Sequence, residues 1–69
     1  MSEIEQLKNR IDNSGIEGIK TAHIRDDYEP VGDMMMRDLC ANGDYVQRKT
    51  PMHSYSQEWR IFNSDSKPY

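Results

Sequence analysis

Three residues have side chains that can ligate a metal ion or act as nucleophile and base, namely His23, Cys40 and His53. Structural zinc sites usually pair their ligands as C-x-x-C or H-x-x-x-H, whereas these three residues lie in separate segments without such spacing. Cys40 also follows Leu39 at the expected core face of a helix, where a thiol behaves as a small apolar group. The pattern therefore favours neither a metal site nor cysteine-based catalysis.

Phosphate-binding and nucleophile motifs are also missing from the sequence. The glycines of "SGIEGIK", residues 14–20, have the wrong spacing for a phosphate-binding loop. A chain of 69 residues also has little room for a pocket that excludes water. We expect a protein that is not an enzyme and that carries no cofactor.

The basic residues of the second half give the stronger signal. The net charge is −3, but residues 1–35 contain eight acidic and four basic residues, whereas residues 36–69 contain four acidic and five basic ones. Arg48 and Lys49 lie in one strand-like run and Arg60 in the next, so pairing of the two runs is expected to bring three positive charges close together. Such a cluster suits the binding of phosphate groups.

Two helices are expected before residue 30. Ser2 and Glu5 form an S-x-x-E capping pattern, and apolar residues follow at helical spacing, which predicts a helix over about residues 2–13. The glycine-containing segment 15–19 predicts a connector or a very short strand. Thr21 is the expected cap of a short second helix that reaches Tyr28, with Arg25 and the two aspartates after it facing water.

A third helix is expected to begin at Glu29 or Pro30 and to stop at Asn42-Gly43. Its core stripe comprises Val31, Met35, Met36 and Leu39. Two of the three consecutive methionines are thus explained by packing, although flexible methionines also suit binding surfaces. On the outer face, Asp33 and Arg37 have the spacing of an i,i+4 ion pair.

Two alternating runs, "YVQRKT" and "EWRIF", predict the strands of a hairpin. Trp59 and Ile61 fall on one face of the second run, where we expect Trp59 to anchor a small core. The fold class is therefore α+β, with three helices followed by a two-stranded antiparallel hairpin. Residues 1–62 are expected to form a single domain and residues 63–69 a flexible tail.

This order of elements resembles a winged helix-turn-helix domain. The similarity rests on "LCANGDYVQRK", from Leu39 to Lys49, where a helix ends at a glycine and leads into a basic strand, and on "EWRIF" as the returning strand of the wing. In such domains the third helix enters the major groove of DNA, the second crosses the backbone and the wing contacts phosphate or the minor groove. The resemblance implies a recognition helix at about residues 30–42, a wing at 45–62, and a role in transcription regulation.

The DNA-binding residues implied by this resemblance are Arg37, Arg48, Lys49, His53, Tyr55, Gln57 and Arg60. Arg37 has two readings, because it can contact a guanine edge or pair with Asp33. Tyr55 lies between two serines in the loop and is the preferred aromatic contact. Duplex DNA is the expected partner, and homodimerisation is expected to support the stability of so small a core.

A second hypothesis assigns the function to the acidic half. The chain would then be an inhibitor or adaptor that binds a host or regulatory protein, like the compact acidic proteins common in phages, and the hairpin would be structural. This hypothesis predicts sensitivity to substitution at Glu17, Asp26, Asp27 and Glu29. With a single cysteine, no signal-peptide pattern and no apolar run of roughly 20 residues, we expect a cytoplasmic protein without a membrane role.

Overall fold

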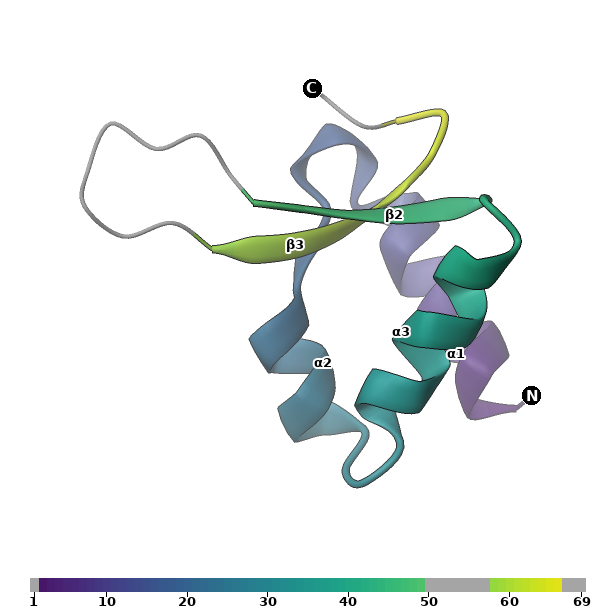
Figure 1. Cartoon of the computed structure of the whole chain (residues 1–69), viewed down its shortest axis with the longest axis vertical. Coiled ribbons are helices and arrows are strands. Elements are labelled where there is room, and N and C mark those ends of the chain that lie inside the picture. The colour runs from purple at the N-terminus through teal and green to yellow at the C-terminus, as the bar shows by residue number, and fades with distance from the viewer. Residues whose placement is uncertain (1, 50–57, 67–69) are drawn as a thin grey trace.

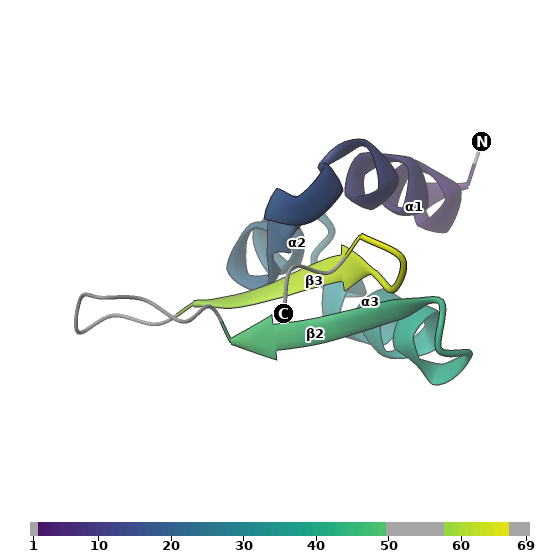
Figure 2. The ribbon, with the colours of Figure 1, turned by 90° about the horizontal axis from the view of Figure 1, so that it is seen from above.

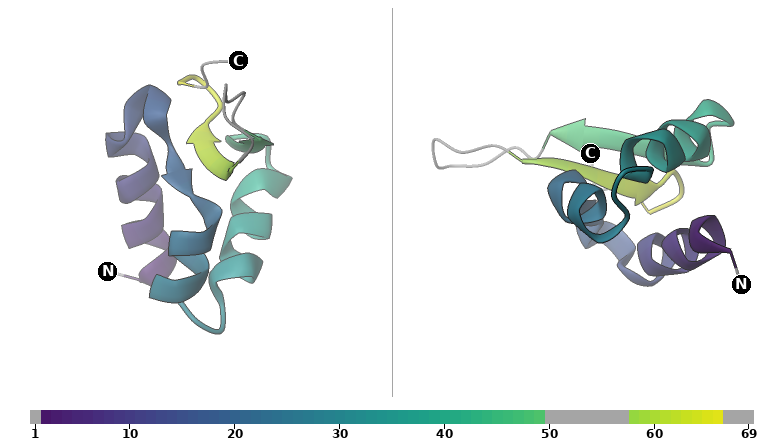
Figure 3. Two further views of the ribbon diagram at one scale, coloured as in Figure 1. Left: turned by 90° about the vertical axis from the view of Figure 1, so that its left-hand side faces the viewer. Right: turned by 90° about the horizontal axis from the view of Figure 1, so that it is seen from below.

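The computed structural model describes residues 2–49 and 58–66. The elements follow the order α1 (Glu3–Asn13), a 3-10 turn η1 (Gly15–Glu17), β1 (Ile19–Lys20), α2 (Thr21–Asp27), α3 (Gly32–Ala41), β2 (Tyr45–Lys49) and β3 (Trp59–Asn63) (Figure 1). The three α-helices gather beneath one face of the sheet, with α2 to one side of α1 and α3 (Figure 1 and Figure 3). The α+β class and the three helices are confirmed.

Helix α1 forms where its cap and apolar spacing predict it. The Ser2 hydroxyl oxygen accepts a hydrogen bond from the Glu5 amide at 3.4 Å, and Leu7 and Ile11 are fully buried one turn apart. Helix α2 begins differently from the prediction. Lys20 occupies the cap position, and Thr21 is buried inside the helix, where its hydroxyl donates to the Trp59 carbonyl at 3.4 Å.

Helix α3 begins at Gly32, two or three residues after the expected start. Residues 28–31 instead form a turn, in which the Val31 amide donates to the Tyr28 carbonyl at 2.8 Å. The predicted end is confirmed, since the helix stops at Ala41 and Gly43 has a φ of +82°. Met35 and Met36 are buried as expected, whereas Met34 is 60% exposed.

The sheet has three strands, so the prediction of a two-stranded hairpin was incomplete. All pairs are antiparallel and the order is β1-β3-β2, with β2 and β3 side by side across the helices (Figure 2). Ile61 of the central strand lies opposite Ile19 on one side and Gln47 on the other. Strand β1 has only two residues, too few to show the alternation by which a strand is recognised in a sequence.

The middle of the central strand β3 is buried on both faces. Ile61 is fully buried in the core formed with the helices. The remaining core residues come from all three helices and β2, namely Leu7, Ile11, Ile24, Tyr28, Met35, Met36, Leu39 and Tyr45. Phe62, which alternates to the other face, is 1% exposed. It lies against Gly18, where an added Cβ would be 2.5 Å from the Phe62 ring.

Side-chain hydrogen bonds fix the sheet and α2 to α1. Asp12 of α1 accepts from the Tyr45 hydroxyl at 3.0 Å and from the Asn63 amide at 2.9 Å, both through Oδ1. Arg10 donates to Asp27 at 3.0 Å and to the Tyr28 hydroxyl at 3.2 Å. After β3, the Ser64 amide donates to the Asp44 carbonyl at 2.9 Å. Within residues 2–49 and 58–66, the helices are all too short or too polar to cross a bilayer.

Candidate nucleic-acid interface

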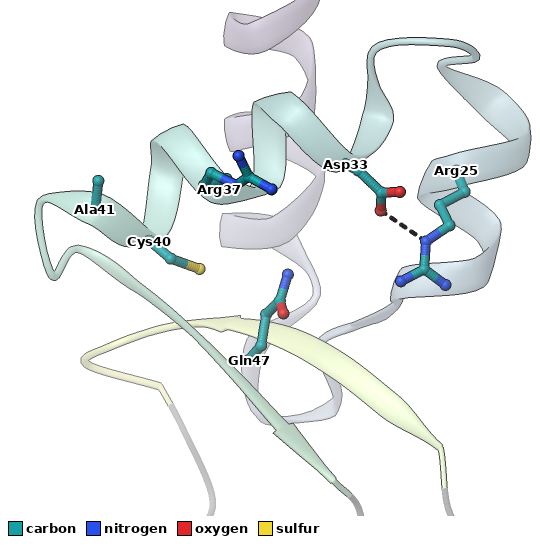
Figure 4. Close-up of a pocket in the computed structure, with 6 residues that line it drawn as sticks. All are labelled: Arg25, Asp33, Arg37, Cys40, Ala41 and Gln47. Atoms are coloured by element: carbon teal, nitrogen blue, oxygen red, sulfur yellow. Dashed lines mark hydrogen bonds and ion pairs between the residues drawn. The ribbon is translucent and has the colours of Figure 1, made fainter.

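Helices α2 and α3 and strand β2 enclose a cleft of about 510 Å³. It is lined by Arg25, Asp33, Arg37, Cys40, Ala41 and Gln47 (Figure 4). The α3 residues recur at intervals of three and four positions, so they share one side of the helix. Arg25 enters from α2, and Gln47 reaches up from the sheet (Figure 4). The cleft therefore combines two guanidinium groups, one carboxylate and one amide.

Asp33 pairs with Arg25, and the predicted pair with Arg37 is wrong. The Arg25 Nε donates to Asp33 Oδ1 at 2.6 Å. The two helices approach closely at Gly32, where an added Cβ would be 2.8 Å from the Ile24 carbonyl oxygen. This approach places the first turn of α3 beside α2, which local spacing within α3 cannot reveal.

Arg37 is exposed near the middle of α3. Among residues 2–49 and 58–66, no partner forms an ion pair or hydrogen bond with its side chain. Its guanidinium group lies at the cleft (Figure 4). With Asp33 engaged elsewhere, the five N–H donors of Arg37 are available to a ligand.

The hairpin divides its basic residues between the two faces of the sheet. Arg48 lies directly opposite Arg60, and both point away from the helices because Ile61, the neighbour of Arg60, points toward them. Lys49 lies opposite Trp59 on the helix side, with its Nζ 6.0 Å from the centre of the indole ring. The expected cluster of three charges therefore contains Arg48 and Arg60 but not Lys49.

Arg60 makes contacts that hold the sheet together. Its Nη1 donates to the Glu17 carbonyl at 3.0 Å, and its Nη2 donates to Glu58 at 3.3 Å. Glu58 also binds Lys20 at 3.0 Å, and this hydrogen bond is the main cause of the lowered pKa of the Glu58 carboxyl group. The guanidinium of Arg60 thus links β3 to the η1 segment, and both of its terminal nitrogens already have a partner within the fold.

Trp59 is not the core anchor that the alternating pattern predicted. It is 51% exposed at the first position of β3. A second hollow of about 390 Å³ lies beside it, and Arg25 lines both hollows. The other residues of this second hollow are Lys20, Thr21, Ala22, His23 and Glu58. Sequence reasoning missed both Arg25 and the exposure of Trp59.

His53, Tyr55 and Gln57 lie outside the described residues. Cys40 is half-buried, and burial raises the pKa of its thiol, which favours the protonated form. In the described part of the chain, no three His, Cys, Asp or Glu side chains are grouped as metal ligands would be.

The residues Arg25, Arg37, Gln47, Lys49 and Trp59 form what we call the helix-side surface. It carries three cations, one amide and one exposed aromatic ring. These groups suit an anionic ligand that also offers flat, hydrogen-bonding edges. Searches with protein-family models, curated proteins and solved structures find no match to the chain.

Proposed function

We propose that this chain is a small, non-enzymatic DNA-binding regulator that contacts duplex DNA through its helix-side surface. Helix α3 enters the major groove and presents Arg37 to the base edges. The β2–β3 hairpin follows the backbone with Lys49 close to phosphates, whereas Arg48 lies on the opposite face of the sheet, outside this surface. This is the function implied by the winged helix-turn-helix resemblance.

The single observation that carries the proposal is the state of Arg37. It is exposed on α3, its expected partner Asp33 is bound to Arg25, and Gln47 lies across the cleft. An arginine in this situation can donate two hydrogen bonds to guanine O6 and N7. The four residues 28–31 between α2 and α3 also have the length of the turn in a helix-turn-helix motif.

The net charge of −3 opposes binding to DNA. Counterion release by phosphate contacts supplies most non-specific affinity, and acidic residues near the interface reduce it. Among the described residues that line the cleft, however, Asp33 is the only acid, and its charge is paired with Arg25. The proposal therefore predicts modest affinity for the monomer, which a homodimer on two half-sites would raise.

The test is fluorescence anisotropy of labelled duplexes titrated with protein at several salt concentrations. We expect salt-sensitive binding, and Lys49→Ala should reduce the log–log salt slope by about 0.9 for the phosphate that the variant no longer neutralises. Arg48→Ala, on the opposite face of the sheet, should change the slope less. Arg37→Ala should weaken binding by about 1–3 kcal/mol on a preferred duplex. Lys8→Ala removes the same charge from α1, outside the cleft lining, and should have little effect.

Two results would contradict the proposal. One is the absence of duplex binding at low salt up to about 100 μM, the weak end of typical non-specific binding. The other is an equal effect of Lys8→Ala and Arg37→Ala, which would mean that only total charge matters. The first result would favour the acidic protein-binding hypothesis, and the second would leave only non-specific attraction to DNA.

A further inference from the structure

The ion pair between Arg25 and Asp33 engages only one of the three guanidinium nitrogens of Arg25. Nε of Arg25 donates to Asp33 Oδ1 at 2.6 Å. Within the described residues, no hydrogen bond or ion pair engages the two terminal nitrogens of Arg25, which Figure 4 shows outside the contact with Asp33. The side chains are 56% and 64% exposed, so a ligand in the cleft can reach them.

A guanidinium held at Nε presents its remaining donors in a fixed plane. Guanine is recognised in the major groove by two parallel N–H groups, directed to O6 and N7. Nη1 and Nη2 of Arg25 have this geometry. The bond to Asp33 already restricts rotation of the Arg25 side chain, so less conformational entropy is lost when a base binds. Asp33 itself carries a negative charge, which disfavours contacts with phosphate.

We propose that Arg25, oriented by Asp33, reads a guanine in the major groove beside the base contacted by Arg37. This inference rests on the proposed function, since it names the base that the same surface recognises. Asp33 is a positioning residue here. It contributes selectivity for guanine and lowers the general affinity for DNA.

The experiment begins by selecting duplexes from a random pool with the wild-type protein. We expect guanine to be enriched at one position that loses its preference in Arg25→Ala. Arg25→Lys should lose the same preference, because an ammonium group is a point charge without the planar pair of donors. Arg37→Ala serves as the matched variant, and it should alter a different position.

Base analogues then identify the atoms involved. Replacing the selected guanine with 7-deazaguanine removes the N7 acceptor and should weaken wild-type binding about five- to tenfold, at the lower end of the discrimination by a bidentate contact. Arg25→Ala should bind both duplexes equally. Asp33→Asn keeps the side-chain shape and should reduce the guanine preference while binding random duplexes more tightly at low salt.

The possible outcomes separate this inference from the proposed function. Duplex binding in which Arg25→Ala weakens all sequences equally would make Arg25 a phosphate contact and overturn the inference alone. An unchanged guanine preference in Asp33→Asn would overturn the positioning role. If the wild type binds no duplex, both proposals are wrong. Circular dichroism should show that the variants remain folded, since an exposed pair contributes little to stability.

Discussion

At the scale of single residues, Asp12 has an unusual share of the connections between elements. One carboxylate oxygen accepts from the side chains of Tyr45 on β2 and Asn63 on β3. Tyr45 is 6% exposed, and burial, followed by its hydrogen bond to Asp12, raises its pKa from 10.0 to about 12. The neutral hydroxyl is therefore the form that the folded state favours.

This arrangement predicts a loss of stability at high pH. The unfolded chain ionises Tyr45 near pH 10 and the folded chain near pH 12, so the stabilisation is complete below pH 10 and disappears as the pH rises to about 12. Tyr45→Phe should cost about 1–2 kcal/mol at pH 7 because the hydrogen bond is removed, and it should flatten the decline above pH 10. Urea denaturation at a series of pH values measures both effects.

Tyr28→Phe is the control for this prediction, because it removes a tyrosine that contacts Arg10 but keeps Tyr45. The decline should persist in this variant. An identical pH dependence in Tyr45→Phe and the wild type would mean that Tyr45 is not responsible.

Individual residues also show what the sequence could indicate about the candidate site. The exposure of Arg37 was predictable, because helix periodicity places it opposite the apolar stripe. For Arg48 and Lys49, strand alternation required only that at least one be exposed, and both are. The partner of Asp33 could not be predicted. The sequence shows its i,i+4 neighbour Arg37 but not Arg25, which lies on a different helix. Trp59 shares the alternation of buried Ile61 but is 51% exposed beside the start of α2, and alternation alone cannot show how completely the helices cover each position of a strand.

At the scale of elements, the junction between η1 and β1 depends on Gly18. This residue has a φ of +66° and a ψ of −167°, a region that is essentially restricted to glycine. A Cβ there would also be 2.5 Å from the Phe62 ring and 2.7 Å from the Ile61 carbonyl oxygen. Both the backbone and the packing of β3 therefore exclude a side chain.

Gly18→Ala is expected to destabilise the fold by about 3–5 kcal/mol, the sum of backbone strain and overpacking. That loss is comparable to the whole stability of a domain of this size. Gly15→Ala is the matched control, because Gly15 also has a positive φ, +59°, but no atom lies within 4 Å of an added Cβ. It should cost about 1–2 kcal/mol. Thermal denaturation compares the two, and equal losses would rule out the packing contribution.

The elements differed in how far the sequence predicted them. Helix α1 has a capping pattern and a regular apolar stripe, so its bounds were clear. The starts of α2 and α3 were misplaced because Thr21 and Pro30 have side chains typical of helix starts, whereas in the fold Thr21 bonds to β3 and Pro30 lies in the turn. The pairing of β1 with β3 joins residues as far apart as Ile19 and Ile61, and a two-residue strand contains no local sign of it.

At the scale of the whole molecule, the uneven charge distribution has a measurable effect on the proposed DNA binding. Asp26 and Glu29 are both exposed. Asp26 directly follows Arg25 of the helix-side surface in α2, and Glu29 lies in the turn after α2, where it lines a hollow together with Arg25. Asp26→Asn with Glu29→Gln should raise duplex affinity several-fold at low salt. The gain should shrink as salt increases, because the Debye length falls from about 30 Å at 0.01 M to about 10 Å at 0.1 M.

Anisotropy titrations of this double variant over that range of salt test the prediction. An unchanged affinity at 0.01 M would mean that these acids lie far from the bound duplex. The protein-binding hypothesis predicts a different result. The same substitutions should weaken binding of a protein partner that contacts these acidic side chains, and DNA binding should be absent.

The central position of β3 has a consequence for how the chain can be divided. Strands β1 and β2 each pair with β3 and not with each other. A fragment that ends after β2 would keep the three helices but have two unpaired strand edges with a gap between them, an arrangement prone to association. A separate peptide containing β3 would fit that gap, with Ile61 and Phe62 entering opposite faces. The first fragment, with β1 and β2, would therefore bind the second fragment, with β3. We expect a chain cut between residues 49 and 58 to reassemble from these two fragments.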